Sequence, residues 1–332
     1  MIGMRRQRMV ATGHPWRSYL AAIIASILWG SLYPAGKPAI AAVGPMQVAF
    51  CRALLACLTM GALVVARGDA HTFAILFRKR WPGILGISAT SFFGSSLLAM
   101  LALGLVSASI IGLLNNTSPL WLAVGAALFY PPRRPAVLVA GSGAAFVGVG
   151  LIFFPDILHG SLAVPASLNL LGILFALGGS WVIATSTIIG RKVMLGGDPI
   201  AISALASSAA VPLLGTLVLA NGGFQPILSA PIQAKLLLLY VGVGCTAFNF
   251  TLWFYALQHL PAAQAAPFQY LIPPISVILS AVTLGEPLTT GLVVGGLLIV
   301  CGLVATQRAG NRTSAAPETR GPVDGLVPSS EQ

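Results

Sequence analysis

Charge is the scarcest property of this sequence. Only 8% of the 332 residues are charged, whereas 57% are hydrophobic and the mean hydropathy is +0.91. A soluble domain carries about 25% charged residues, so a chain with so little charge cannot cover a water-facing surface. The composition excludes a soluble globular protein and predicts that much of the apolar surface faces lipid.

Acidic residues and cysteines are also few. Seven Asp and Glu stand against 18 Lys and Arg, which gives a net charge of +11. The basic residues lie in short runs between apolar stretches, a pattern that favours a membrane protein over a nucleic-acid partner. The four cysteines show no CxxC or zinc-like spacing, so we expect no metal site, no disulfide framework and no cofactor.

Apolar segments of the length that spans a bilayer, roughly 20 residues, fill most of the chain. We predict ten of them, in an all-α membrane protein. The first five are Tyr19–Val43, Met46–Ala66, Trp81–Leu103, Ser107–Phe129 and Pro135–Phe154. The second five are Leu170–Gly190, Ile200–Ala220, Lys235–Leu257, Ala263–Leu284 and Leu288–Gln307.

The basic residues predict the orientation of these spans. With the N-terminus inside, 15 of the 18 Lys and Arg fall in cytoplasmic segments, and only Lys37, Arg52 and Lys235 do not. The positive-inside rule then places both termini in the cytoplasm. We expect a cytoplasmic segment at 1–18, a first five-helix repeat at 19–154 and an extracytoplasmic connection at 155–169. A second repeat follows at 170–307, and then a disordered cytoplasmic tail at 308–332.

The two halves of the chain are related in sequence. The segment 118–141 aligns without gaps on 273–296, so that Pro119 falls on Pro274 and Gly141 on Gly296. Each half has an odd number of predicted spans, and the second must therefore be inverted relative to the first. Inverted repeats of this kind place a substrate site near the midplane and work by alternating access.

At three places the sequence resembles EamA-type members of the drug/metabolite transporter superfamily. The residues that carry the resemblance are LWGSLYPAGKPAI (28–40), GPMQVAFCRA (44–53) and LGEPLTTGLVVGGLLIVCGL (284–303). It implies a secondary transporter, with amino acids, nucleosides, other metabolites or drugs as substrates. The family usually carries a Glu in both halves, but here Glu286 aligns on Pro131, which puts a symmetrical carboxylate pair in doubt.

Two basic residues inside spans are the sharpest candidates for a site. Lys37 and Arg52 each lie seven residues from the Gly44–Pro45 turn, which is ~10 Å along a helix. A charge inside a span costs ~2.5–3.5 kcal/mol, so we expect them to bind a substrate carboxylate or phosphate. The alternative is that they reach the interface or bond carbonyls of broken helices.

Neutral polar and aromatic residues extend this prediction. We predict a substrate site formed by Lys37, Arg52, Trp29, Tyr33, Asn115, Asn116, Trp181, Asn249, Gln269 and Tyr270. Pro119, Pro274 and Glu286 are predicted as gate or hinge residues, with a solvated helix-end carboxylate as the alternative for Glu286. Packing and interhelical hydrogen bonding are the alternatives for the aromatic and amide residues.

The expected activity is transport without enzymatic chemistry. We predict a secondary transporter, acting as an exporter of small amphipathic metabolites such as amino acids, in an inner or plasma membrane and with the monomer as the transporting unit. The alternatives are an exporter of nucleosides or drugs and an intramembrane enzyme. No Asp or Glu lies inside a predicted span, and the four histidines fall in loops or at helix ends. Proton-coupled transporters rely on such groups, so we expect facilitated transport or another kind of coupling.

Overall fold

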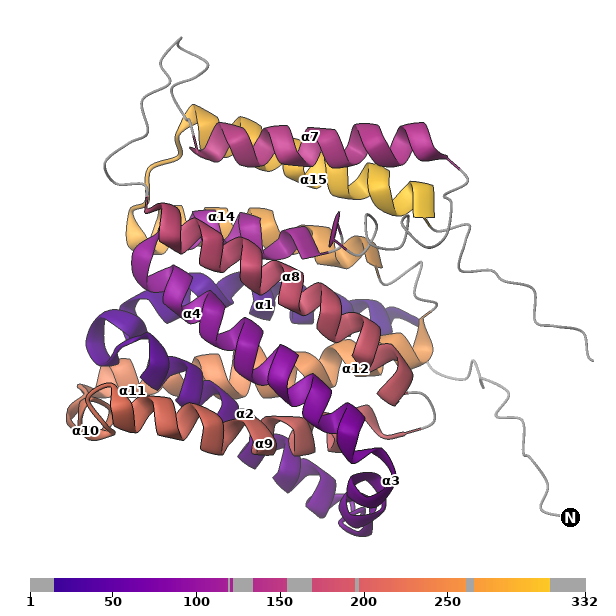
Figure 1. The fold of residues 1–332 in the computed structure, drawn as a ribbon, viewed down its shortest axis with the longest axis vertical. Coiled ribbons are helices and arrows are strands. Elements are labelled where there is room, and N and C mark those ends of the chain that lie inside the picture. Colours follow the sequence, from indigo (N-terminus) through magenta and orange to yellow (C-terminus); the bar gives the residue numbers. More distant parts are fainter. Residues whose placement is uncertain are drawn as a thin grey trace, which may run out of the picture.

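A computed structural model describes residues 15–118, 120–121, 134–153, 169–194, 197–260 and 266–310. Within these ranges the chain is helical, with short turns and no strand (Figure 1). The predicted tail at 308–332, the connection at 155–169 and the hinge residue Pro119 lie largely or wholly outside the described residues.

Most helices follow the predicted spans to within a few residues, but α3 begins at His71, ten residues before the predicted start at Trp81. In the first half they are α1 (Pro15–Val43), α2 (Pro45–Ala66), α3 (His71–Ile87), η1 (Ser88–Ser95), α4 (Ser96–Leu105), α5 (Ala108–Leu114), η2 (Asn115–Thr117) and α7 (Pro135–Phe153). In the second half they are α8 (Leu170–Met194), α9 (Pro199–Ala220), α10 (Gln225–Ser229), α11 (Ile232–Leu239), η4 (Tyr240–Phe248), α12 (Asn249–His259), η5 (Ala266–Leu271), α14 (Ile272–Leu284) and α15 (Thr290–Gly310).

Seven helical stretches of the described chain are long and apolar enough to cross a membrane. Two further predicted spans correspond to the shorter apolar helices Phe268–Leu284 and Thr290–Thr306. The fourth predicted span begins as α5 and η2, and its second half lies outside the described residues. The chain is thus a multi-pass helical protein, and the total of ten spans with both termini in the cytoplasm remains a prediction.

Departures from α-helix recur at equivalent places in the two halves. Spans three and eight each contain a π-helical segment, η1 and η4. Spans four and nine each contain a 3₁₀ segment, η2 and η5. A π segment widens the helix by one residue per turn and often marks a functional site, so these segments are candidates for positions that shape a site.

Proline has different effects in different helices. Pro34 and Pro38 lie inside α1, and the helix continues through both of them. Pro274 lies in the first turn of α14, directly after η5. A missing N–H is tolerated there because the first turn has no intrahelical acceptor.

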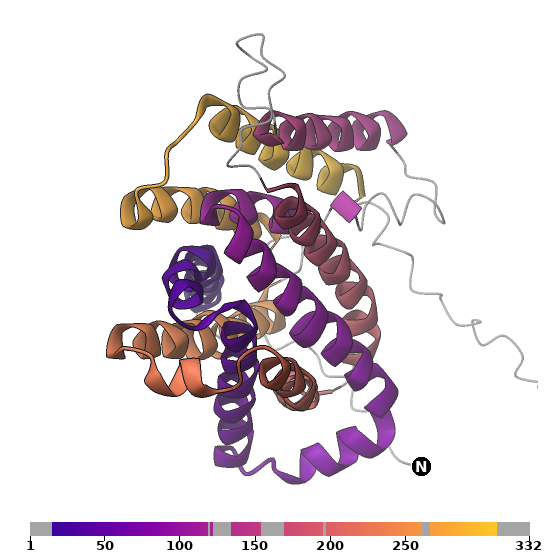
Figure 2. The same cartoon turned by 60° about the vertical axis from the view of Figure 1, so that its left-hand side comes forward.

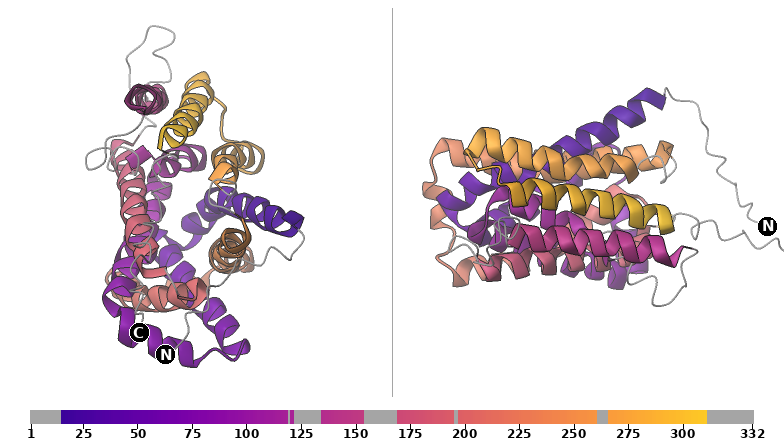
Figure 3. Two further views of the ribbon diagram at one scale, coloured as in Figure 1. Left: turned by 90° about the vertical axis from the view of Figure 1, so that its right-hand side faces the viewer. Right: turned by 90° about the horizontal axis from the view of Figure 1, so that it is seen from above.

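Helix α1 runs through the middle of the molecule (Figure 3). It contacts α2, α4 and α5 of the first half and α11, α12 and α14 of the second. Side chains of α1 therefore reach both halves, which makes this helix the natural place for a central site.

Helices α7 and α15 form a closely packed pair at one edge of the molecule (Figures 1 and 3). Gly148 and Gly295 face each other, and a methyl group added to either would overlap the carbonyl oxygen of the other. Gly141 and Gly302 meet in the same way seven residues, about two turns, along. Small residues allow such close backbone approach in membranes.

Candidate functional site

Arg52 is the cation at the centre of the helix bundle. Its Nε donates to Thr246 Oγ1 at 2.8 Å, and its Nη1 lies 3.3 Å from Ser96 Oγ. Ser96 is the first residue after η1, and Thr246 lies inside η4. The π segments of the two halves therefore place both hydroxyl partners of this arginine.

The guanidinium is only partly satisfied by these bonds. An arginine has five N–H donors, and two of them are used by the described residues. No carboxylate contacts Arg52 in the described part of the chain. A planar cation with unused donors is suited to bidentate binding of a carboxylate or phosphate.

Tyr33 and Asn115 form a hydrogen-bonded pair in the interior. Asn115 Nδ2 donates to the Tyr33 hydroxyl at 2.5 Å, and the Tyr33 side chain is only 3% exposed. Arg52 is close enough to Tyr33 for an electrostatic interaction. The Oδ1 of Asn115 is buried and has no partner among the described residues. An unpartnered buried acceptor is costly, and a ligand donor or a water would satisfy it.

Further polar side chains, with hydroxyl and thiol groups, lie on the other side of α1. Ser31 Oγ lies 2.7 Å from Tyr240 Oη and 3.7 Å from Cys245 Sγ. Cys245 directly precedes Thr246, the partner of Arg52. We call the whole group the central polar cluster; its members are Ser31, Tyr33, Arg52, Ser96, Asn115, Tyr240, Cys245 and Thr246.

Lys37 lies in a different environment from Arg52. Its Nζ donates to the carbonyl oxygens of Leu103 at 2.7 Å and Val106 at 2.6 Å, at the C-terminal end of α4. Lysines commonly satisfy the last carbonyls of a helix in this way. These contacts match the alternative interpretation, in which the lysine bonds backbone carbonyls. Lys37 is therefore not a member of the central polar cluster that contains Arg52.

Glu286 caps helix α5. Its carboxylate accepts from Ala108 N at 2.7 Å, from Ser109 N at 2.9 Å and from Ser109 Oγ at 2.6 Å. It also interacts electrostatically with Lys37. The side chain stays partly exposed, and the role of Glu286 as a gate residue remains a prediction. The contact joins the α14–α15 connection of the second half to span four of the first.

The other predicted site residues divide between the interior and the surface. In the amide orientation that satisfies both of its groups, the Asn249 side-chain oxygen accepts from Trp29 Nε1 at 2.9 Å. The side-chain nitrogen then donates to Ala25 O at 3.0 Å. Trp29 also packs against Phe250 and Trp253, with ring centroids 5.6 and 6.0 Å away. These contacts hold α12 against α1.

The remaining amides and Trp181 lie outside the central polar cluster. Asn116 Nδ2 donates to Gly112 O within its own helix, at 2.6 Å. Gln269 and Tyr270 are partly buried in η5. Trp181 is 59% exposed on α8, so the expectation that it lines the interior does not fit its position. Ser96 and Thr246 were missed, because small hydroxyl residues inside spans carry no distinctive pattern.

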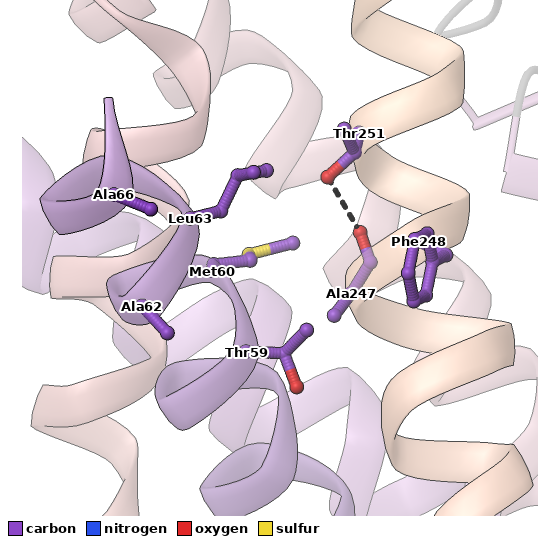
Figure 4. Close-up of a pocket in the computed structure, with 8 residues that line it drawn as sticks. All are labelled: Thr59, Met60, Ala62, Leu63, Ala66, Ala247, Phe248 and Thr251. Carbon is purple, nitrogen blue, oxygen red and sulfur yellow. Dashed lines mark hydrogen bonds between the residues drawn. The ribbon is translucent and has the colours of Figure 1, made fainter.

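An apolar groove lies between α2 and the η4–α12 segment. Its volume is about 290 Å³, and its lining residues are Thr59, Met60, Ala62, Leu63, Ala66, Ala247, Phe248 and Thr251. Figure 4 shows Met60 and Leu63 extending from α2, with Ala247 facing them. Thr59 follows Arg52 by seven residues, ~10 Å along α2, and Ala247 follows Thr246. The groove therefore begins about two helical turns from Arg52 and continues toward Ala66, the last residue of α2.

Metal binding finds no support in the described part of the chain. No group of three or more His, Cys, Asp or Glu side chains there could hold a metal ion. The four cysteines are free thiols.

Comparison with known proteins agrees with the fold and with the two-half organisation. The EamA-like transporter family matches residues 16–154 and again residues 170–307. An uncharacterized transporter of Archaeoglobus fulgidus is 26% identical over 87% of this chain and 97% of its own length. A probable terminal-alkyne amino-acid exporter of Streptantibioticus cattleyicolor is 26% identical over 90% and 97%.

A solved crystal structure shares the fold. It superposes on 89% of this chain and 98% of its own with a TM-score of 0.59, at 20% sequence identity. Because the family matches both halves over most of their length, the chain belongs to the EamA-like transporter family.

Proposed function

We propose that this membrane transporter exports small amphipathic metabolites of the amino-acid class, and that Arg52 binds their carboxylate. The observation that carries the proposal is a central guanidinium with unused donors and no acidic partner among the described residues. Similarity to the probable terminal-alkyne amino-acid exporter of Streptantibioticus cattleyicolor supports the same substrate class.

Each part of the neighbourhood has a role in this proposal. The carboxylate pairs with Arg52, and the unpartnered Oδ1 of Asn115 accepts a bond from an amino group. The apolar groove between α2 and η4 receives the substrate side chain. A substrate with one charged end and one apolar end would satisfy all three surfaces, whereas a polycation would be repelled by Arg52.

Transport would follow from the two related halves. In inverted-repeat transporters one half rocks against the other around a central site, and we propose that motion here, with ten spans and both termini in the cytoplasm of an inner or plasma membrane. No carboxylate belongs to the central polar cluster, so we propose facilitated export or coupling that does not use an acidic residue there.

A nucleoside or drug exporter is the second candidate, favoured by the apolar groove and its aromatic residue Phe248. The two candidates differ in whether the substrate needs a carboxylate. Binding of an apolar amino acid, of its amide and of a nucleoside to the purified protein, measured by thermal stabilisation, separates them. We expect the amino acid to bind and the amide, which lacks the carboxylate, to bind at least tenfold more weakly.

Variants of Arg52 locate the interaction. A hydrogen bond to a charged group contributes ~1.5–3 kcal/mol, so Arg52→Gln should weaken amino-acid binding by about 10- to 150-fold. Arg134→Gln, an exposed arginine at the start of α7, is the control and should bind normally. Equal binding of the acid and its amide, unchanged in Arg52→Gln, would refute the carboxylate site.

A further inference from the structure

The first turns of α3 do not belong to the span that follows them. The apolar helix continues from His71 to Leu105, which is 35 residues and ~52 Å, against a hydrocarbon thickness of ~30 Å. In Figure 2 the start of α3 lies along the lower edge of the molecule, at an angle to the long rod that leads to α4. Pro82 lies inside α3 and accounts for the turn, since proline removes a helix hydrogen bond.

We call residues 71–81 the α3 foot. One face of it is fixed to the second half of the chain. Arg80 Nη1 donates to the carbonyl oxygen of Val193 at the end of α8, and Leu76 is only 6% exposed. A side chain on Gly197, which precedes α9, would meet both Arg80 and Leu76. The α3 foot is therefore a docked element with a defined orientation.

A second face of the α3 foot is apolar and uncovered. Phe77 is 56% exposed and Trp81 is 52% exposed, and they lie four residues apart, on one side of the helix. Large aromatic residues concentrate at the boundary between headgroups and acyl chains. The predicted topology places this end of α3 at the cytoplasmic surface, where such a boundary lies.

The third face is basic. Arg78 and Lys79 are exposed, and neither makes a hydrogen bond or an ion pair with another described residue. His71 is exposed on the same side of the helix. The connection from α2 adds exposed Arg67, and its one acidic residue is Asp69.

We propose that the α3 foot binds the headgroup of an anionic phospholipid. Arg78 and Lys79 would pair with the phosphate and the anionic headgroup, while Phe77 and Trp81 enter the acyl boundary. A helix with adjacent basic and apolar faces lies in the interface plane in this way. Charge complementarity selects an acidic lipid over a zwitterionic one, and the apolar face selects a lipid over a soluble anion.

A lipid bound to the α3 foot would influence both halves of the protein, because the foot contacts both. The α3 foot leads directly into span three of the first half and is bonded through Arg80 to α8 of the second. An anionic lipid bound there would fix the foot and so favour the arrangement in which Arg80 meets Val193. This inference concerns the membrane and holds for whatever substrate Arg52 receives.

The test uses the full chain purified in neutral detergent, with phosphatidylglycerol and phosphatidylcholine as probes. Native mass spectrometry measures retained lipid, and thermal unfolding measures stabilisation. Each basic residue near an anionic surface contributes about fivefold to binding, so Arg78→Gln with Lys79→Gln should lower phosphatidylglycerol affinity by about 25-fold. Arg78→Lys with Lys79→Arg should restore it, and Arg134→Gln is the control for charge removed elsewhere.

The outcomes separate the alternatives. A preference for phosphatidylglycerol that is lost in the neutral double variant and kept in the control supports the proposal. Equal binding of the two lipids by the wild-type chain overturns it, as does equal loss in the control. Competition by inorganic phosphate or glycerol phosphate also overturns it, because the site would then recognise a soluble anion. Because lipid retention is measured without substrate, failure here leaves the amino-acid proposal intact, and the reverse also holds.

Discussion

Replacing Glu286 by glutamine should destabilise the protein by disconnecting its two halves. The carboxylate accepts three hydrogen bonds, two from backbone N–H groups and one from Ser109 Oγ. A glutamine keeps one acceptor oxygen and turns an NH₂ group toward a backbone N–H donor. Hydrogen bonds to a charged group contribute ~1.5–3 kcal/mol each. We expect a loss of ~2–4 kcal/mol, toward the lower end because the carboxylate is only half-buried.

The measurement is the unfolding free energy or apparent Tm of the purified protein at fixed detergent concentration. Asp198→Asn is a matched control, because Asp198 also caps a helix, α9, but accepts from Ile200 N within its own half. It should cost only a few tenths of a kcal/mol, because Asn and Asp are about equally good N-cap residues. Ser109→Ala added to Glu286→Gln should cost less than the sum of the two. Additive effects, or a wild-type Tm for Glu286→Gln, would refute the capping geometry.

The same variant tests the prediction that Glu286 is a gate residue. A contact that only stabilises the fold changes Tm but leaves the transport rate unchanged once the protein is folded. A contact that must break in each cycle holds one state, so its loss changes the rate as well. The transport rate of Glu286→Gln in proteoliposomes, at a temperature well below its Tm, therefore separates a gate residue from one that only stabilises the fold.

Two further predictions follow from the contacts of Lys37 and of α7. Lys37→Gln should lower the Tm by several degrees, because the carbonyls of Leu103 and Val106 at the end of α4 lose their donor. The substrate KM should change less than twofold. A large change in KM would place the lysine in the substrate site. Gly148→Ala should lower the unfolding free energy by ~1–3 kcal/mol, since the added methyl group would overlap Gly295. Gly143→Ala is the control, because a methyl group there meets nothing within 4 Å, and it should leave the unfolding free energy nearly unchanged.

The helix boundaries could be predicted from the sequence because lipid imposes a simple rule. Every backbone polar group in the hydrocarbon must be bonded internally, so an apolar run long enough to span must be helical. The predicted Met46–Ala66 and the observed Pro45–Ala66 differ by one residue. The start of α3 was missed by ten residues, since a charged amphipathic turn at the interface does not stand out in hydropathy.

The rotation of each helix and its irregular turns could not be predicted. A span surrounded by apolar neighbours and lipid is hydrophobic on all sides, so periodicity does not reveal which face points inward. Trp181, expected inside, is exposed, while Ser96 and Thr246 face Arg52. Their positions depend on η1 and η4, and π segments have no sequence signature that periodicity could reveal.

The two halves share their backbone geometry but not their charges. The π and 3₁₀ segments recur at equivalent positions in both, yet Arg52 corresponds to Ala206, counted from Pro45 and Pro199, and Glu286 corresponds to Pro131. In the mechanism proposed above, the features that both halves retain serve the rocking motion, whereas the substrate binds in one orientation and needs a charged residue in one half only. A change in substrate should therefore follow substitution at Arg52 and spare the irregular segments that position it.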